Sequence, residues 1–403
     1  MSDKLIQLEK KTKYTELVDN NPFENKIKLL HHLDRLAEWK LNGTSFPVNW
    51  ECFPTNYCNF ACAFCISAFS HTYNPSMTKE EKKNALKVLD NISAISNHPE
   101  RRKGLEPERM RTVFIEGKKM GLKSVTFSGG GEPTSAYGFS KIVQYAIDAG
   151  LEIALMTNGA FREKDLDIIG NNMKWVRVSL DTYDYDRYKA EKNTHLLPQV
   201  LKNIKSLVKY PTKIGLNSNV GDYNKDEILE FAKKSKDIGV NYIQYRPILG
   251  LPFENSFNEK YRVQQSTEWV EELIPSLLEA ENLSDEGFQV HVSWDKFEGL
   301  MKENYGRKYK KCTYHHFQCI LDANGFLQVC AYRMNEPDKF AFGNIYENSV
   351  EEIWNSQRRK DVLKMTCESL DIEKCQQGCK GDSINSLIHT IENPDKKSDV
   401  NFL

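Results

Sequence analysis

Short stretches rich in β-branched and aromatic residues alternate along the chain with longer, charged stretches in which apolar residues recur at helical spacing. The β-rich stretches, which predict strands, are residues 48–53, 124–128, 152–157, 175–180, 213–220 and 241–248. The stretches of helical periodicity are residues 82–92, 107–120, 139–149, 163–169, 200–208 and 226–238. Gly121, Gly150 and Gly239 follow three of them, where a helix C-terminus favours a left-handed residue. This alternation predicts a parallel sheet built from six βα units.

The chain around these units has patterns of its own. Residues 27–41 and 267–280 predict amphipathic helices, and residues 288–294 predict a strand. The charged residues 98–108 form an insertion that we interpret as a solvated loop, with a mobile lid as the alternative. The expected parts are a helical extension (1–46), the βα units (47–250), a connector (251–310), a second small domain (311–390) and a frayed tail (391–403).

Composition narrows the class of protein. Hydrophobic residues make up 40% and charged residues 28% of the 403 positions, which is typical of a globular enzyme and excludes a disordered or collagen-like chain. The net charge of -1 gives no indication of nucleic-acid binding. Because the chain has no secretory signal and no run of about 18 apolar residues, we expect a cytoplasmic protein without membrane association. In a reducing compartment, ten cysteines favour metal binding or catalysis over disulfides.

The first group of cysteines directly follows the first predicted strand. Cys58, Cys62 and Cys65 are separated by three and two residues, so one short loop can wrap their thiols around a single metal centre. Zinc is one candidate, but a structural zinc site requires a fourth ligand. Cys52 alternates on the strand and is expected to be a buried apolar cysteine. Three thiolates suit an iron-sulfur cubane that keeps one iron open to another ligand.

A glycine-rich run follows the second predicted strand. Residues 128–133 read Ser-Gly-Gly-Gly-Glu-Pro, and the glycines permit a ligand to approach the backbone closely. The run matches neither the spaced glycines of a dinucleotide fold nor a phosphate-binding loop. The carboxyl ends of neighbouring parallel strands meet at one edge, where barrel sheets place their active sites. We therefore expect the cysteines and the glycines to lie side by side.

The CxxxCxFC pattern, which includes Phe64, and the Gly130-Gly131-Glu132 run resemble motifs of the radical S-adenosylmethionine (SAM) enzymes. The resemblance implies an α/β fold, a partial (β/α)6 TIM-type barrel followed by a small α+β auxiliary-cluster domain. It implies a 4Fe-4S cluster on the three cysteines, with Phe64 and the Gly-Gly-Glu run at the SAM site. The expected chemistry is reductive cleavage of SAM to methionine and a 5'-deoxyadenosyl radical, which abstracts a hydrogen atom from a substrate carbon.

Polar residues within the later apolar strands are further candidates for the SAM site. By position, Ser179 and Asn217 resemble residues that contact the carboxylate and the ribose of SAM in these enzymes. Arg246 is a candidate for an anionic group. A polar residue that only caps a loop at a strand end is the alternative for each. The resemblance also implies a reduced electron donor of the flavodoxin or ferredoxin type.

The second group of cysteines begins with Cys312. Twelve residues separate Cys312 from Gly325, and four residues separate Gly325 from Cys330. Asn324-Gly325 predicts a hairpin turn, and residues 349–354 predict a short capped helix. These features resemble the SPASM or twitch extension of radical SAM enzymes, which carries auxiliary iron-sulfur clusters. There are enough thiols for one auxiliary 4Fe-4S cluster, with zinc as the alternative. The expected ligands are Cys312, Cys319, Cys330 and Cys379, with Cys375 as a substitute for one of them and Cys367 spare.

The combined features predict a radical SAM enzyme of the oxidoreductase or lyase type. Its substrate is expected to be a carbohydrate, nucleoside or other small metabolite that is oxidised, epimerised or rearranged. This expectation depends on the residues before the first strand, which predict a helix and no winged-helix domain for peptide binding. A peptide or protein substrate is the alternative. A non-catalytic iron-sulfur electron carrier or zinc-binding scaffold is an alternative of another class.

Overall fold

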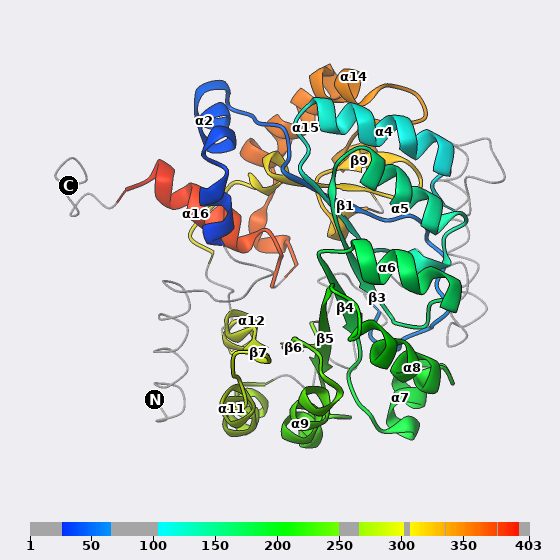
Figure 1. The fold of residues 1–403 in the computed structure, drawn as a ribbon. Coiled ribbons are helices and arrows are strands. Elements are labelled where there is room, and N and C mark those ends of the chain that lie inside the picture. Colours follow the sequence, from blue (N-terminus) through cyan, green and yellow to red (C-terminus); the bar gives the residue numbers. More distant parts are fainter. Residues whose placement is uncertain are drawn as a thin grey trace, which may run out of the picture.

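The computed structural model describes residues 26–65, 104–249, 266–301, 307–334, 336–376 and 378–394. In these residues, ten strands form a single sheet in the order β10-β9-β8-β1-β2-β3-β4-β5-β6-β7 (Figure 1). The predicted helix at residues 82–92, most of the 98–108 insertion and the last residues of the tail lie outside the described residues.

The six predicted strands are confirmed, and neighbouring members pair in parallel in the order of the sequence. Their bounds are Asn49–Cys52 (β1), Ser124–Phe127 (β2), Glu152–Thr157 (β3), Trp175–Ser179 (β4), Lys213–Val220 (β5) and Tyr242–Pro247 (β6). The predicted glycines take positive φ angles of 102° at Gly121, 70° at Gly150 and 91° at Gly239.

The sheet extends beyond the six strands on both sides. The strand predicted within the connector, Gln289–Val292 (β7), pairs in parallel with β6. On the other side, Gln318–Leu321 (β8) pairs in parallel with β1, and an antiparallel hairpin continues with Phe326–Gln328 (β9) and Ala341–Asn344 (β10). The second group of cysteines is therefore attached to the edge of the barrel sheet through main-chain pairing.

Helices cover the outer face of the sheet (Figure 1). Those within the βα units are Pro107–Lys119 (α4), Phe139–Asp148 (α5), Leu166–Asn172 (α6), Tyr185–Lys192 (α7), Leu197–Leu207 (α8) and Ile228–Ile238 (α9). The others are Leu33–Asn42 (α2), Thr267–Glu281 (α11), Trp294–Leu300 (α12), Pro337–Phe340 (α13), Val350–Asn355 (α14), Gln357–Glu368 (α15) and Asp382–Glu392 (α16). Sequence analysis missed α7 because its charged sequence buries few residues and has no apolar stripe. Among the described helices, none combines the length and apolarity required to cross a membrane.

The two faces of the sheet differ in chemistry. On β2, Val125 and Phe127 are fully buried, and the Phe127 ring lies edge-on against Phe114 of α4 and Phe139 of α5. Thr126, between them in sequence, has its side chain on the opposite face because side chains alternate along a strand. The apolar core thus lies between sheet and helices, while polar side chains point into the barrel.

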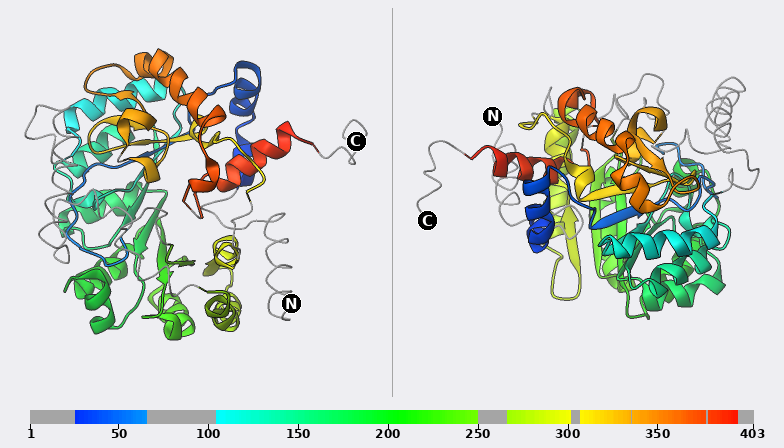
Figure 2. Two further views of the ribbon diagram at one scale, coloured as in Figure 1. Left: turned by 180° about the vertical axis from the view of Figure 1, so that it is seen from behind. Right: turned by 90° about the horizontal axis from the view of Figure 1, so that it is seen from above.

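Helices from the two ends of the described chain lie side by side. Helix α16 packs against α2 and the 3-10 helix Lys26–His31 (η1) that precedes it (Figure 2). Leu29, Trp39, Phe317 and Ile388 form a separate apolar cluster between these elements. This cluster fixes the position of α16, which begins three residues after Cys379.

The β8–β9 hairpin turns around a buried carboxylate. Asp322 Oδ1 accepts hydrogen bonds from the backbone N–H groups of Asn324 and Phe326, both at 2.9 Å. Its Oδ2 accepts one from Gln328 Nε2 at 2.7 Å. Burial raises the pKa of Asp322 to about 7. Gly325 at the turn has a φ of 86°, which an L side chain would strain.

We expect this aspartate to make stability depend on pH. Its folded-state pKa is raised, so its contribution is complete at low pH and is lost as the pH rises through about 7. Between about pH 5 and pH 8 the wild type should lose on the order of 2 kcal/mol of unfolding free energy relative to Asp322→Asn. The asparagine keeps the carbonyl oxygen for the turn, and Gln328 can turn its amide to pair with the new donor. Anaerobic urea denaturation at several pH values measures the difference.

The matched control is Asp371→Asn, which changes an exposed aspartate that also accepts a backbone N–H in a turn. Its stability curve should run parallel to that of the wild type. Parallel curves for Asp322→Asn as well would show that Asp322 does not take up a proton in this pH range.

Candidate active site

A cavity of about 340 Å³ lies at the carboxyl ends of the parallel strands. It is lined by every residue that the sequence predicted for the first cluster and for SAM. These residues are Cys58, Cys62, Phe64, Cys65, Gly130, Gly131, Glu132, Ser179, Asn217 and Arg246. The opposite wall comes from the C-terminal region and contains Ala331, Tyr332, Met334, Gln376 and Lys380. The cavity therefore lies between the two cysteine groups.

The cysteine loop has no regular secondary structure and is held by hydrogen bonds to its surroundings. The N–H of Ala61 donates to the carbonyl of Lys192 at 3.2 Å, and that of Ala63 to the carbonyl of Glu191 at 2.8 Å. Both carbonyls belong to the last turn of α7, where a helix has carbonyl groups without partners within the helix. The end of α7 thus fixes the position of the loop.

Burial disfavours the thiolate forms of Cys58 and Cys62 unless a bound cation compensates their charge. Burial raises the pKa of Cys58, and the nearby Cys62 and Glu132 raise it further. Burial also raises the pKa of Cys62, while the ammonium group of Lys192 opposes this. Buried thiols that disfavour each other's ionisation become thiolates when a metal centre supplies the compensating charge. The donor set fits an iron-sulfur cluster.

A buried ion pair lies next to the cysteine loop. Lys192 Nζ lies 2.5 Å from Asp181 Oδ2, and both side chains are almost fully buried. The same ammonium group lies 4.8 Å from the centroid of the Phe64 ring. Asp181 Oδ1 accepts a hydrogen bond from the backbone N–H of Asn219 at 2.8 Å. The pair therefore connects the end of β4, strand β5, helix α7 and the cysteine loop.

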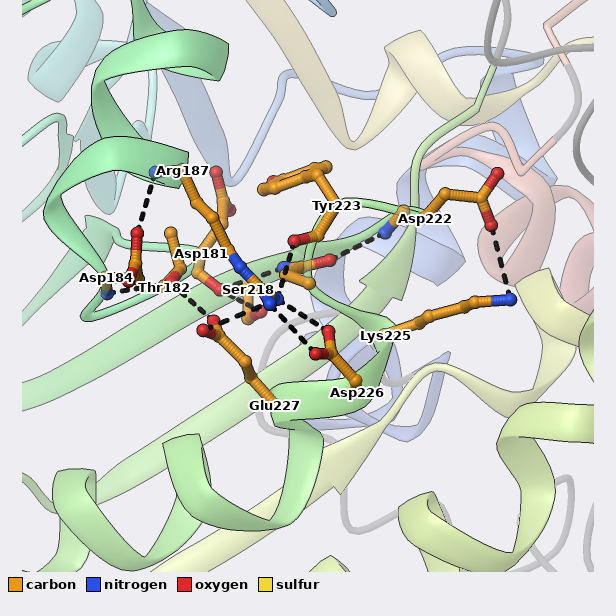
Figure 3. Close-up of polar contacts among 12 residues, drawn as sticks. Asp181, Thr182, Asp184, Arg187, Ser218, Asp222, Tyr223, Lys225, Asp226 and Glu227 are labelled. Atoms are coloured by element: carbon orange, nitrogen blue, oxygen red, sulfur yellow. Dashed lines mark hydrogen bonds and ion pairs between the residues drawn. The ribbon is translucent and has the colours of Figure 1, made fainter.

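A second polar network fixes the start of α7 (Figure 3). Arg187 donates to both carboxylate oxygens of Asp226, at 2.6 and 2.9 Å, and to the carbonyl of Tyr223 at 3.0 Å. Thr182, just after β4, donates to Glu227. The loops that follow β4 and β5 are thereby held to each other, so both ends of α7 are anchored.

The glycine run is bonded to the cysteine loop. The N–H of Gly131 donates to the carbonyl of Thr55 at 3.2 Å, and that of Glu132 to the carbonyl of Tyr57 at 2.9 Å. A Cβ added at Gly131 would lie 2.2 Å from the carbonyl oxygen of Tyr57, so only glycine fits. The expected juxtaposition of the two motifs is present.

Glu132 has most of its hydrogen-bonding capacity used within the protein. Its Oε1 accepts from the N–H and the hydroxyl of Thr134 and from the hydroxyl of Thr157. Its Oε2 accepts from the N–H of Asn158 at 2.7 Å. Burial raises the pKa of this carboxyl group despite these bonds. Because Oε2 has a single donor, it retains capacity for a ligand.

The strand-end candidates lie on adjacent strands. Ser179 of β4 and Asn217 of β5 are register partners, so they are neighbours on the cavity wall. Asn217 donates to Asn219 Oδ1 at 3.3 Å, whereas its own buried Oδ1 has no hydrogen-bond partner among the described residues. A buried amide oxygen without a partner is unfavourable unless a ligand or water supplies a donor. Asn217 is therefore suited to bind a hydroxyl or amino group.

Four charged residues of the cavity were not predicted from the sequence, namely Glu51, Arg177, Lys192 and Lys380. Glu51 of β1 is buried, and its Oε1 lies 2.7 Å from Nζ of Lys380, the residue after Cys379. Glu51 Oε2 is buried without a hydrogen-bond partner among the described residues. A glutamate inside an apolar strand was the available signal for Glu51. No signal in the sequence indicated Lys380, because 329 positions separate it from Glu51, its ion-pair partner.

A second cavity, of about 370 Å³, lies inside the barrel toward the amino ends of the strands. Four residues line both cavities and form the partition between them: Glu51, Met156, Arg177 and Lys380. Arg177 is held in this partition by a hydrogen bond of 2.6 Å from its Nη1 to Gln244 Oε1. Charged and apolar side chains therefore line both cavities inside the barrel.

Four of the C-terminal cysteines influence one another electrostatically. Cys330 and Cys375 raise the pKa of Cys312, after burial as the main cause. Burial raises the pKa of Cys330 to about 11, and Cys375 contributes to this shift. Burial raises the pKa of Cys379, with further contributions from Asp382, Cys330 and Cys312. These mutual influences indicate that the four thiols lie near one another.

Cys319 lies apart from this group, which differs from the ligand set that the resemblance implied. It is the register partner of Trp50 on β1, so its thiol points to the apolar, helix-covered face of the sheet. Burial raises its pKa, and the charged neighbour that affects it is Arg359 of α15 rather than another cysteine. Glu51, the next residue on β1, faces the barrel interior. Spacing along the sequence does not reveal which face of a strand a cysteine occupies.

Comparisons with known proteins agree with this geometry. The model of the radical SAM superfamily matches residues 52–235, and that of the SPASM iron-sulfur cluster-binding domain matches residues 312–380. A GTP 3',8-cyclase of Clostridium perfringens is 28% identical over 200 residues, covering 48% of this chain and 54% of that protein. A probable GTP 3',8-cyclase of Saccharolobus solfataricus is 27% identical over 225 residues, covering 54% and 63%. The chain spans about half the length of these curated relatives.

Solved structures share the fold over a larger part of the chain. SuiB of Streptococcus suis bound to S-adenosylmethionine is 13% identical with a TM-score of 0.60, covering 96% of this chain and 85% of that one. The anSMEcpe protein with bound AdoMet is 16% identical with a TM-score of 0.54, covering 79% and 84%. The shared fold is a partial barrel followed by an auxiliary domain. The chain belongs to the radical SAM superfamily and carries a C-terminal SPASM domain, whose cofactors are 4Fe-4S clusters and SAM.

Proposed function

We propose that the protein reductively cleaves SAM and uses the 5'-deoxyadenosyl radical to abstract a hydrogen atom from a small-molecule substrate. The substrate would be a carbohydrate, nucleoside or other metabolite, and the outcome an oxidation, epimerisation or rearrangement. One observation carries this proposal. The cysteine loop, the glycine run and Asn217 line the same cavity as residues next to the C-terminal cysteines, so a ligand in this cavity would contact both regions.

The residues of this chain would act by binding, orienting and excluding water. Cys58, Cys62 and Cys65 would hold the first cluster, whose role is to supply one electron to SAM. Gly130 and Gly131 let a ligand approach the backbone, and Glu132 Oε2 offers an acceptor to an amino group. Asn217 Oδ1 offers a second acceptor farther along the wall. Phe64 and Lys192 close the cavity beside the cysteine loop.

The small-molecule assignment draws support from the relatives named GTP 3',8-cyclase, whose name describes action on a nucleotide. A peptide substrate is the second candidate, because SuiB bound to its precursor peptide shares the fold with a TM-score of 0.59. A non-catalytic electron carrier or a zinc scaffold is the candidate of another class. Label transfer into 5'-deoxyadenosine, from deuterated metabolites in one series and deuterated peptides in another, separates the first two.

For the auxiliary site we propose Cys312, Cys330, Cys375 and Cys379 as the ligands of one 4Fe-4S cluster. A cluster with four thiolate ligands would have no open iron, so it would serve as an electron relay or as a structural element. This cluster would lie next to the substrate cavity, because Lys380, the residue after Cys379, lines the cavity and pairs there with the buried Glu51.

The two possible ligand sets predict different iron contents. We expect Cys375→Ala to lower the iron and acid-labile sulfide of the anaerobically reconstituted protein from two clusters per chain to about one. Cys319→Ala should leave both values at the level of the wild type, since its thiol faces the apolar side of the sheet. Iron analysis and Mössbauer spectroscopy measure this difference. Loss of a cluster from Cys319→Ala alone would restore the set that the sequence motif implied.

The central prediction concerns SAM cleavage. With dithionite and SAM, the reconstituted protein should form 5'-deoxyadenosine, and Cys58→Ala, Cys62→Ala or Cys65→Ala should each reduce its formation to the level without protein. Cys330→Ala should retain part of the cleavage, uncoupled from substrate, because it changes the other cysteine group. Chromatography of the nucleoside products measures the rates. A wild type that forms no 5'-deoxyadenosine supports the non-catalytic alternative, and equal losses from both groups contradict the separate roles.

A further inference from the structure

A basic hollow lies on the surface beside the auxiliary cysteines. It has a volume of about 480 Å³ and lies between helix α16, the segment 308–311 and Lys40 of α2. The two helices lie side by side in both views (Figures 1 and 2). Ile388 of α16, which lines the hollow, belongs to the apolar cluster between α2 and α16. We define the basic hollow by Lys40, Lys308, Lys310 and Lys311.

The charge of this hollow differs from that of the chain. The whole sequence is almost neutral, with 55 lysines and arginines against 56 acidic residues. The residues that line the hollow include four lysines and a single acidic residue, Glu392, which lies 3.7 Å from Lys311. All four lysines are exposed. Single exposed lysines are ordinary, but three lysines of one segment and a fourth from α2 around one hollow produce a local positive potential that attracts an acidic partner.

The basic hollow is directly connected to an auxiliary cysteine. Lys311 precedes Cys312 in the sequence. Asn385 of α16 lines the hollow, and its Nδ2 lies 4.0 Å from Cys312 Sγ. Its Oδ1 accepts hydrogen bonds from the backbone N–H groups of Thr313 and Tyr314, at 2.8 and 2.9 Å. A single, firmly held side chain therefore separates the floor of the hollow from the thiol.

We propose that the basic hollow is the docking surface for a small acidic electron-carrier protein, of the flavodoxin or ferredoxin kind. This inference rests on the proposed function, because it assumes an iron-sulfur cluster at the auxiliary cysteines. With a cluster bound there, one electron would pass from the reduced carrier to it, so the carrier would be oxidised by one electron and the cluster reduced by one. No covalent bond forms or breaks. The lysines provide attraction and orientation, and Asn385 lies between the two redox groups.

The test compares two variants with equal changes of charge. The first replaces Lys308, Lys310 and Lys311 by glutamate. The control replaces Lys205, Lys209 and Lys233 by glutamate, three exposed lysines on and beside α8 and α9. Binding of oxidised flavodoxin, and separately of oxidised ferredoxin, to the reconstituted proteins is measured by biolayer interferometry at several salt concentrations. The two carriers distinguish between the possible sources of the electron.

We expect the first variant to bind its carrier at least about tenfold more weakly than the wild type and with a flatter salt dependence. SAM cleavage driven by the reduced carrier should fall to a similar extent, while cleavage driven by dithionite stays unchanged. The control variant should behave like the wild type. Equal binding by all three proteins, or equal losses in both variants, would overturn the proposal.

Two further measurements keep the outcome decisive. If the glutamate variant has less iron or a lower Tm, the variant with glutamine at the same three positions replaces it, and a loss of binding of several-fold is still expected. If dithionite drives no SAM cleavage in the wild type, the proposed function fails. The binding measurements then still decide whether the basic hollow is a docking surface.

Discussion

The buried ion pair between Lys192 and Asp181 is the interaction on which the active site depends. Two charges that leave water lose several kcal/mol each in hydration, and this loss is offset only when they meet in good geometry. Here the pair also has a hydrogen bond from the β5 backbone. Because the pair is stable only with both partners present, it fixes the end of α7, to which the cysteine loop is bonded. The irregular cysteine loop is thereby held in one conformation, as the backbone of a strand or helix is.

The second constraint is the parallel pairing of β8 with β1. Strand β1 leads into the first cysteine group, and β8 lies between Cys312 and Cys330 of the second. Their shared register brings the two regions to one cavity, which is lined by the first cysteines and by neighbours of Cys330, Cys375 and Cys379. The ion pair between Glu51 and Lys380 ties the same two regions inside the barrel. Barrel and auxiliary domain thus share one continuous sheet.

The sequence was informative wherever the signal is local. Strand periods, glycines at helix ends and the spacing of Cys58, Cys62 and Cys65 all depend on neighbouring residues, and the six strands were predicted within one or two positions. The predictions were weaker where long-range packing decides. Helix α7 has a charged sequence and is fixed by its loops. The face occupied by Cys319 and the pairing of Glu51 with Lys380 depend on how distant strands meet.

The partition made by Glu51, Met156, Arg177 and Lys380 has a consequence for how this fold diversifies. In closed barrels the interior is a packed apolar core that contributes to stability. Here the main apolar core lies between the sheet and the helices, and charged residues of the interior border two cavities. Glu51 is buried with Lys380 as its ion-pair partner, and Arg177 is buried with Gln244 as its hydrogen-bond partner. Replacing one partner alone leaves a buried charge without compensation, so we expect these inward-facing residues to change together during evolution. New chemistry on this scaffold therefore requires matched replacements that keep each inward-facing charge paired.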